Sequence, residues 1–437
     1  TNEQMNDERT TMMKTTKRNP CIILSHLILL YAVLYHWNNS YLFTTALIMT
    51  DTPTTMPTTM STTALITGST DGIGVTTARN MMIHGTSNSK QQKQNHNNNV
   101  NNVLIHGRDN ERIRIATESL LAGINNNDNK NNSNNDSNCS SSSNNNYNSP
   151  SIAIPLPASD LSTIKGCYDL VKDVKQLLCN DSSATTGTTN TNTNTSTNEG
   201  LNLKILVNNA GVYSRKLMHT PDGLESTFAV NVLAPFIVTS MLLSSLLITN
   251  NNESSSNNND KNNSSSSRIV IASSVSQSQN LPKNYWDDPQ YLNNKRSYSA
   301  HGAYSESKLL VAMLSMEMAH RLKHNNNGAG AGAGIDSSIL TCNCLDPGTV
   351  NTKMLLDGWG KIGIDVDDAM DETWCCTSTE LEGISGKYFV GQTSRKASDD
   401  AYNPIQRDKL WHYLSKLAPE AAEEWDRVVD LYSTKKK

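Results

Sequence analysis

A tyrosine and a lysine stand four residues apart, at Tyr304 and Lys308. Residues at this spacing share one face of a helix, so the phenol and the ammonium group are expected to point toward one site. A phenol with a pKa near 10 exchanges protons poorly at neutral pH, and a neighbouring cation lowers that pKa. The spacing therefore predicts that Tyr304 exchanges a proton with a bound molecule and that Lys308 supplies the charge that tunes it.

A glycine-rich turn follows the first short apolar run, 63–67, and opens directly into a stretch of helical length. The amino terminus of a helix offers free N–H groups to a phosphate, and glycines remove the Cβ atoms that would keep the backbone away from it. This context predicts a site for the pyrophosphate of a dinucleotide. The turn residues expected to hold it are Gly68, Ser69, Asp71, Gly72, Ile73 and Gly74.

The elements that must position these residues alternate along the chain. Strands are expected at 63–67, 103–106, 152–155, 203–207, 268–272, 339–345 and 386–390, and the longer helices at 73–84, 111–121, 162–178, 223–247 and 303–322. Strict alternation implies parallel strands joined by right-handed crossovers. The predicted fold class is therefore α/β, a doubly wound parallel sheet of the Rossmann type in a single domain, with ligands at the carboxyl ends of its strands.

The end of the second strand indicates which dinucleotide is bound. A basic residue there pairs with the 2′-phosphate of NADP(H), whereas an acidic residue accepts a hydrogen bond from the 2′-hydroxyl of NAD(H). Arg108 stands at this place and favours NADP(H), while Asp109 beside it favours NAD(H). We expect NADP(H) to be the cofactor.

The motif Gly-x-x-x-Gly-x-Gly, the segment Asn-Asn-Ala-Gly at 208–211 and the Tyr-x-x-x-Lys pair together resemble the short-chain dehydrogenase/reductase family. The resemblance implies that Ser274, after the fifth strand, polarises the substrate oxygen. It also implies that Asn231 is a fourth catalytic residue, which holds a water linking the lysine to solvent. The further cofactor contacts that it implies are Asn208, Ala210, Gly211, Tyr304, Lys308, Pro347, Gly348, Val350 and Thr352.

Segments 222–231 and 304–309 look most similar to the retinol-dehydrogenase-like branch of this family, which includes the WW-domain-containing oxidoreductase. Two features depart from the family pattern. Pro157 stands where the third strand usually ends in an aspartate that meets adenine, and Asp160 is the alternative for that contact. Leu309 follows the lysine where protochlorophyllide reductase carries a cysteine, which disfavours that activity.

Long tracts of Asn, Ser and Thr, and one of Gly and Ala, interrupt the chain near 87–102, 125–148, 180–198, 250–267 and 324–334. Such composition cannot bury a core, so we expect disordered inserts. Each insert falls between a predicted helix and the next strand, away from the ligand edge, where long loops cost little closure entropy. We therefore expect residues 62–437 to form one domain and residues 1–61 to form a targeting or anchor segment with a linker.

Charge and cysteine content exclude several classes of function. A formal net charge of -4 and a pI of about 6.2, with no basic stripe, argue against nucleic acid as a partner. The cysteines lack the spacing of a metal site and the density of a disulfide scaffold, so we expect reduced thiols and no bound metal. Adjacent Cys375 and Cys376 receive no role.

The apolar segment 21–37 follows Lys14, Lys17 and Arg18. It is at the short end for a membrane span and fits a retained anchor or a cleaved signal. Met49 would be a start that removes it. We expect association with an endomembrane through 21–37 if the segment is retained, and a cytoplasmic protein otherwise.

These features predict an oxidoreductase that transfers a hydride between NADP(H) and a carbonyl or alcohol group of a small molecule. Apolar residues after the Pro-Gly segment, namely Met354, Leu355, Leu356 and Trp359, favour a hydrophobic substrate such as a retinoid, lipid or isoprenoid. The alternative is an NADP(H)-sensing scaffold without significant turnover, against which the intact Ser-Tyr-Lys-Asn set argues. The resemblance leaves monomer and homodimer open.

Overall fold

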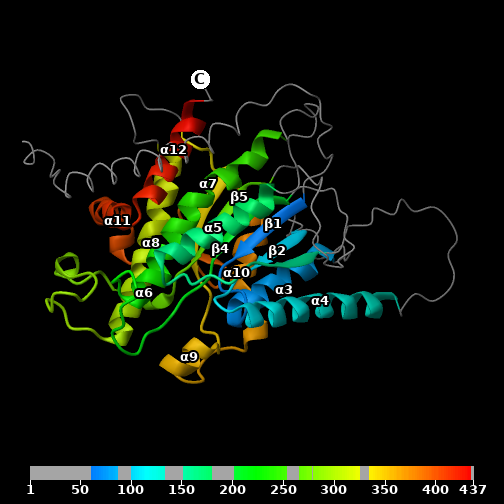
Figure 1. Ribbon diagram of the computed structural model, residues 1–437, viewed down its shortest axis with the longest axis horizontal. Helices are drawn as coiled ribbons and strands as arrows, with labels where there is room; N and C mark the ends of the chain where they lie inside the picture. The colour runs from blue at the N-terminus through cyan, green and yellow to red at the C-terminus, as the bar shows by residue number, and fades with distance from the viewer. Residues whose placement is uncertain are drawn as a thin grey trace, which may run out of the picture. The chain divides into compact units, whose positions relative to one another are not determined.

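The computed structural model describes residues 61–86, 100–132, 151–179, 201–252, 265–277, 279–324 and 334–434, and the statements below concern these residues. They contain an eight-stranded sheet in the order β3-β2-β1-β4-β5-β6-β7-β8 (Figure 1). Its strands are β1 (Ser61–Ile66), β2 (Asn102–Ile105), β3 (Ile152–Pro155), β4 (Leu201–Asn208), β5 (Ser267–Ala272), β6 (Leu340–Asp346), β7 (Tyr388–Val390) and β8 (Thr393–Arg395).

The strand order gives the doubly wound topology predicted from the sequence. The chain moves outward from β1 to β2 and β3, then returns to place β4 on the other side of β1. The junction between β1 and β4 is therefore the point where the winding reverses, and the carboxyl ends of these strands flank the expected ligand site. Pairs from β3 through β7 are parallel, whereas β8 pairs antiparallel with β7 and was not predicted.

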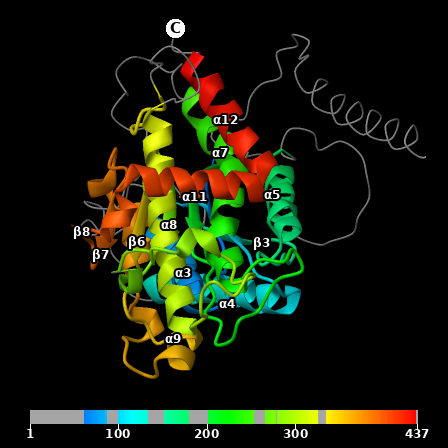
Figure 2. The same ribbon diagram turned by 90° about the vertical axis from the view of Figure 1, so that its left-hand side faces the viewer.

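The helices cover both faces of the sheet. They are α3 (Gly72–Thr86), α4 (Asn110–Asn132), α5 (Ile164–Cys179), α6 (Ser226–Phe228), α7 (Ala234–Asn252), α8 (Ala300–Lys323), α9 (Lys353–Gly358), α10 (Asp371–Thr377), α11 (Pro404–Leu417) and α12 (Pro419–Thr434). In Figure 2, α11 crosses α8 and α12 runs beside α7, and both pairs are in contact.

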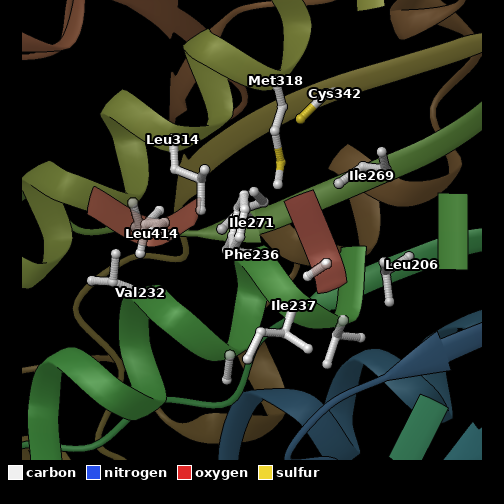
Figure 3. Packing of buried hydrophobic residues seen from close by; sticks show 14 of the residues in the cluster. Leu206, Val232, Phe236, Ile237, Ile269, Ile271, Leu314, Met318, Cys342 and Leu414 are labelled. Atoms are coloured by element: carbon white, nitrogen blue, oxygen red, sulfur yellow. The ribbon is translucent and has the colours of Figure 1, made fainter. Parts of the chain in front are cut away.

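Strand side chains are buried on both faces, as continuous β-branched runs predict for a parallel sheet. Leu65 and Leu206 face the larger cluster, formed with α5, α7, α8, α11 and α12. Ile66 and Val207, their neighbours in sequence, face the other cluster, formed with α3, α4 and α10. Figure 3 shows the larger cluster, where Phe236 of α7 packs near Ile271 of β5.

Two of the predicted helices differ from those observed. The helix predicted at 223–247 is divided into α6, a π-helical turn at Ala229–Leu233, and α7. A π turn depends on local packing and has no reliable sequence signal, and it often marks a functional position. The helix predicted at 111–121 continues to Asn132, into the first part of the insert expected at 125–148.

The segments outside the described residues occur at equivalent places along the chain. Each of the five longer internal gaps begins after a helix, namely α3, α4, α5, α7 and α8, and ends before the next strand. The inserts predicted near these places lie largely outside the described residues, and their order and disorder stay a prediction. The ligand edge is built from strand-to-helix connections, which the structure describes except at residue 278.

One helical region, Ser226–Leu247, is long and apolar enough to cross a membrane, with a mean hydropathy of 1.9. Its most apolar stretch is 83% buried inside the domain, so it packs as a core helix. The segment 21–37, on which the membrane prediction rests, lies outside the described residues.

Candidate active site

Helix α8 holds the tyrosine and lysine. The helix is capped by Ser299, whose hydroxyl accepts a hydrogen bond from the backbone N–H of Gly302. Tyr304 and Lys308 are both buried, and the Lys308 Nζ atom lies 5.6 Å from the centre of the Tyr304 ring. The ammonium group donates to the backbone oxygen of Ala272, at the end of β5, over 2.8 Å. The two side chains therefore share one face of the helix and meet the carboxyl end of the sheet.

Burial dominates the proton affinities of both groups. It raises the pKa of Tyr304 to about 12; the charge of Asp346 raises it too, and a hydrogen bond with Ser274 lowers it. Burial lowers the pKa of Lys308 to about 8, and the carboxylates of Asp346 and Glu372 oppose this change. Burial is the largest influence on the Tyr304 pKa and the net shift is upward, so the lowering of this pKa by Lys308 stays a prediction.

The two serines after β5 have different contacts. Ser274 faces the cavity described below, and its hydroxyl accepts hydrogen bonds from the backbone N–H of Ser276 at 3.2 Å and from its hydroxyl at 2.7 Å. Ser273 instead donates to the backbone oxygen of Lys308 over 2.8 Å. Ser273 thus ties the end of β5 to α8, which sets Ser274 beside Tyr304.

Asn231 lies in the π turn, and its side chain is fully engaged. Its amide oxygen accepts from the backbone N–H of Val212 at 2.8 Å, and its amide nitrogen donates to the Val212 oxygen at 3.1 Å and to Ser307 at 3.0 Å. It therefore joins the strand-to-helix connection after β4 to α8. The residue is buried behind the cavity wall, while the lining is formed by neighbouring Val230.

The glycine-rich turn is pressed against the connection after β4. Gly68 has a φ of 68°, and a Cβ atom on it would lie 3.0 Å from the Cα of Ala210, so only glycine fits there without strain. The Asn209 amide donates to the backbone oxygen of Thr67 at 2.8 Å. These contacts leave the backbone of the turn facing an open cavity.

That cavity has a volume of about 930 Å³ and runs along the carboxyl ends of the strands. Most of the predicted site residues line it: Gly68, Asp71, Gly72, Ile73, Arg108, Ala210, Gly211, Ser274, Tyr304, Lys308, Pro347, Gly348, Val350 and Thr352. Fourteen of the predicted positions, taken from the motifs and from the family resemblance, thus meet at one place.

Three residues predicted to bind cofactor do not line the cavity. Asn208 points into the core and donates to Thr239 of α7 over 2.9 Å, and its neighbour Asn209 lines the cavity instead. Ser69 is fully buried and bonds the backbone of β1 and β2. Gly74 packs against the Asn209 side chain, so closely that a Cβ atom on Gly74 would overlap with it. Ser69, Gly74 and Asn208 therefore contact neighbouring parts of the protein and not the cavity.

His106, at the end of β2, is a connecting residue that sequence reasoning did not single out. Its Nδ1 atom accepts from the backbone N–H of Gly68 at 3.1 Å, so Nε2 carries the proton and faces Ser159. Burial lowers the pKa of His106 to about 4, which keeps the ring neutral. Ser159 and Asp160 line the cavity after β3, whereas Pro157 does not.

Asp346, at the end of β6, is a second residue that was missed. Its side chain is buried, lines the cavity and accepts from the backbone N–H of Val275, next to Ser274, at 3.1 Å. Burial raises the pKa of Asp346, and the charge of Lys308 lowers it. An acidic residue directly before a Pro-Gly pair was the available signal, but a turn explains that pattern equally well.

Aromatic rings surround the outer side of Tyr304. The ring centres of Tyr213 and Trp359 lie 5.8 and 5.5 Å from that of Tyr304, and 4.8 Å from each other. The Tyr213 hydroxyl lies 3.1 Å from the Nδ1 atom of His301. Together with Met218 and Met354, these side chains make this end of the cavity mostly apolar.

No family model matches the chain. Among curated proteins, human retinol dehydrogenase 14 is 30% identical over 223 residues, which cover 48% of this chain and 56% of the relative. Human polyprenol dehydrogenase is 26% identical over 222 residues, covering 48% and 59%. Short-chain dehydrogenase TIC 32 B from Brassica napus is 26% identical over 228 residues, covering 49% and 63%. The chain therefore matches between half and two thirds of the length of these relatives.

Proposed function

We propose that the chain is a member of the short-chain dehydrogenase/reductase family and that it transfers a hydride between NADP(H) and a carbonyl or alcohol group. The observation that carries this proposal is the convergence of Ser274, Tyr304 and Lys308 on one wall of a cavity whose other end is a glycine-rich turn. Such a cavity brings a proton donor within reach of a dinucleotide site.

The described residues fit a nicotinamide dinucleotide. Gly72 has a φ of 57°, and five of the six residues of the turn 68–73 line the cavity. The cavity volume of about 930 Å³ is at the upper end of ordinary ligand sites, as a dinucleotide with a substrate needs. When bound, the nicotinamide supplies or accepts the hydride, while the protein supplies position and a proton.

The protein residues have distinct parts in the proposed reaction. In the reducing direction Tyr304 gives its phenolic proton to the substrate oxygen, and Ser274 donates a hydrogen bond to the same oxygen as charge develops on it. The raised pKa of about 12 keeps Tyr304 protonated at neutral pH, so that it starts as an acid. Lys308, with Asn231 behind it, would hold the ribose hydroxyls of the nucleotide. It would also help to return a proton to the Tyr304 oxygen after the phenol has given its own proton away.

Arg108 supports NADP(H) as the preferred cofactor. It lines the cavity and is exposed, with no carboxylate partner among the described residues. Asp109, which favoured NAD(H) on sequence grounds, has its carboxylate oxygen 2.8 Å from the backbone N–H of Arg112, where it caps α4. The acidic side chain is thus occupied at the helix terminus, and the basic one remains available for a 2′-phosphate.

We further propose a hydrophobic substrate, because Tyr213, Trp359 and Met354 enclose the end of the cavity beside Tyr304. Each ring offers apolar area with little loss of conformational entropy on binding. The proposal concerns the chemical class only, such as a long-chain, isoprenoid or retinoid carbonyl.

The test is a comparison of NADPH and NADH oxidation by the protein from Met49 onward with aliphatic, isoprenoid, retinoid and small polar carbonyls. The Tyr304→Phe variant accompanies it, and we expect its kcat to fall by at least about a thousandfold because the proton donor is lost. Its NADPH affinity, measured by fluorescence titration, should stay within about threefold.

Three results would contradict parts of this proposal. Turnover on polar ketones alone would refute the hydrophobic substrate, and equal activity in the Tyr304→Phe variant would refute the catalytic assignment. Cofactor binding without turnover in either direction would favour an NADP(H)-sensing scaffold instead.

A further inference from the structure

Asp346 is a buried carboxylate on the wall of the cavity. It stands at the carboxyl end of β6, and only 6% of the residue is exposed. It lines the cavity, whereas Glu372, the other carboxylate that acts on Lys308, does not. A carboxylate taken out of water is costly unless an opposite charge or hydrogen bonds compensate for the lost hydration. Such a group in a ligand cavity calls for a role toward the ligand.

The surrounding residues compensate for this charge only in part. A carboxylate oxygen of Asp346 accepts from the backbone N–H of Val275 at 3.1 Å, and the backbone N–H of Gly348 donates to the same side chain. Burial raises the pKa of Asp346, and these hydrogen bonds and the charge of Lys308 oppose that rise. Among the residues that the structure describes Asp346 forms no ion pair, and the Lys308 ammonium group donates to the backbone oxygen of Ala272. Part of the negative charge is therefore left to act on a molecule that fills the cavity.

The chemistry of the proposed reaction places the nicotinamide ring beside Asp346. A carbonyl carbon receives the hydride while its oxygen receives the proton of Tyr304, so the ring must lie next to Tyr304 and Ser274. Ser274 directly precedes Val275, the residue that donates to Asp346, and β5 and β6 are neighbours in the sheet. Burial is the larger cause, but the Asp346 charge also raises the pKa of Tyr304. The carboxylate therefore stands at the nicotinamide end of the cavity.

The reaction changes the charge of this part of the nucleotide and of no other part. The nicotinamide ring is neutral in NADPH and positively charged in NADP⁺, because the departing hydride takes an electron pair with it. The adenine, riboses and phosphates are the same in both forms, so contacts with the glycine-rich turn and with Arg108 cannot tell them apart. A negative charge in a poorly hydrated wall attracts the oxidised ring and has little effect on the neutral one.

We propose that the Asp346 carboxylate stabilises bound NADP⁺ relative to bound NADPH, and that it thereby favours carbonyl reduction over alcohol oxidation at this site. In that direction the substrate carbon gains the hydride and the substrate oxygen gains the Tyr304 proton. The positive charge left on the ring then lies beside the carboxylate. This inference rests on the proposed function and concerns the direction of the reaction, which the proposed function leaves open.

The test measures the dissociation constants of NADPH and NADP⁺ for the wild-type protein and for Asp346→Asn, which keeps an acceptor for the Val275 N–H and removes the charge. NADPH binding is followed by its fluorescence, and NADP⁺ binding by displacement of NADPH. Titration at about pH 6.5 keeps Lys308, whose pKa is about 8, in its ammonium form. We expect NADP⁺ to bind about fivefold more weakly to the variant and NADPH affinity to change less than about twofold.

Three further variants separate the charge of Asp346 from its place in the structure. Asp365→Asn is the matched control, because it removes the same charge from an exposed side chain outside the cavity, and its ratio of the two dissociation constants should equal that of wild type. Asp346→Glu keeps the charge, so its ratio should stay closer to wild type than that of Asp346→Asn, even if both affinities fall. If circular dichroism shows that Asp346→Asn does not fold, Asp346→Ser carries the same expectation, because it also keeps an oxygen acceptor without the charge.

Other outcomes would overturn the inference. Equal weakening of NADP⁺ and NADPH by Asp346→Asn would mean that Asp346 only holds the end of β6 in place, and unchanged affinities would mean that its charge does not reach the ring. A greater loss for NADPH would contradict the sign of the effect. In each of these cases, turnover that depends on Tyr304 would leave the proposed function standing. If the wild-type protein binds neither nucleotide, the proposed function fails and this inference fails with it.

Discussion

At the scale of single residues, the site depends on buried charges that face one another. Lys308 of α8 is surrounded by the carboxylates of Asp346 and Glu372, and Asp371 acts in turn on Asp346. Glu372 accepts a hydrogen bond from Thr77 at 2.7 Å, and burial raises its pKa to about 7. The charge state of the lysine therefore depends on carboxylates contributed by β6 and α10.

Asp346→Asn should move the alkaline limb of the pH profile. The pKa of Lys308 is about 8, and the Asp346 charge raises it, so activity that needs the ammonium form falls as the pH rises through about 8. Asparagine keeps an acceptor for the Val275 N–H but removes the charge. We expect the fall in kcat/KM to occur about half a pH unit lower, measured from pH 6 to 10.

Asp365→Asn is the control for this prediction, because Asp365 is exposed and outside the cavity and the charge change is the same. Its alkaline limb should match that of wild type. An Asp346→Asn limb at the wild-type pH, or one at a higher pH, would mean that the carboxylate does not act on Lys308.

Residue types at strand ends could be predicted from the sequence, but side-chain environments could not. Spacing placed Tyr304 and Lys308 on one helix face because the period of a helix is fixed, and the family resemblance added Ser274 at the end of a parallel strand. The pKa of Tyr304 depends on burial, which comes from segments distant in sequence. For the same reason the sequence did not reveal that Asn209, and not the predicted Asn208, lines the cavity.

At the scale of elements, the segment between β5 and α8 is held by a buried ionic network. Arg296 pairs with Glu306 of α8, and their side chains are only 5% and 15% exposed. The Tyr291 hydroxyl donates to Glu306 at 3.0 Å, and the Arg296 guanidinium lies 4.6 Å from the ring centres of both Tyr285 and Tyr291. Because Glu306 lies between Tyr304 and Lys308 in sequence, this network anchors the segment to the part of α8 that carries both residues.

Glu306→Gln should destabilise the fold, because it leaves the buried guanidinium of Arg296 without a counter-charge. We expect a loss of about 2 to 4 kcal/mol in the free energy of unfolding, measured by urea denaturation. Glu111→Gln breaks an exposed pair with Arg114, whose side chains are 62% and 53% exposed, and should leave the urea midpoint close to that of wild type. Equal losses in the two variants would show that the Arg296 pair has no more effect than a surface pair.

Element boundaries show the same limit of prediction. Strand β3 was predicted at its observed residues, Ile152–Pro155, because a β-branched run stands between polar tracts. The π turn at Ala229–Leu233 and the antiparallel strand β8 were not predicted. Both depend on partners supplied by the folded sheet, which no local pattern reports.

At the scale of the whole molecule, the two edges of the sheet differ in their tolerance of change. Replacing 180–200, the stretch between α5 and β4, with a Gly/Ser linker of about ten residues should change the free energy of unfolding by less than about 1 kcal/mol, because closure entropy depends only weakly on linker length. Thermal unfolding and NADPH titration would measure this, and both should otherwise match wild type. The same replacement of 214–222, on the cavity edge, should abolish turnover, because it removes the cavity-lining residues Met218, His219 and Thr220. Loss of nucleotide binding in the 180–200 variant would contradict the separation of the two edges.

This separation means that the chain could be cut in a helix-to-strand connection without removing any residue that lines the cavity. Each of the five longer connections outside the described residues follows a helix and precedes a strand, so a cut there leaves strand–turn–helix units on both sides. The connection between Cys179 and Leu201 is such a place, since it separates β1–β3 from β4–β8 at the reversal of the winding. Two separately expressed fragments would then each carry half of the site, with the glycine-rich turn on one and Tyr304 and Lys308 on the other. Reassembly of the two fragments could therefore be followed by the return of oxidoreductase activity after mixing.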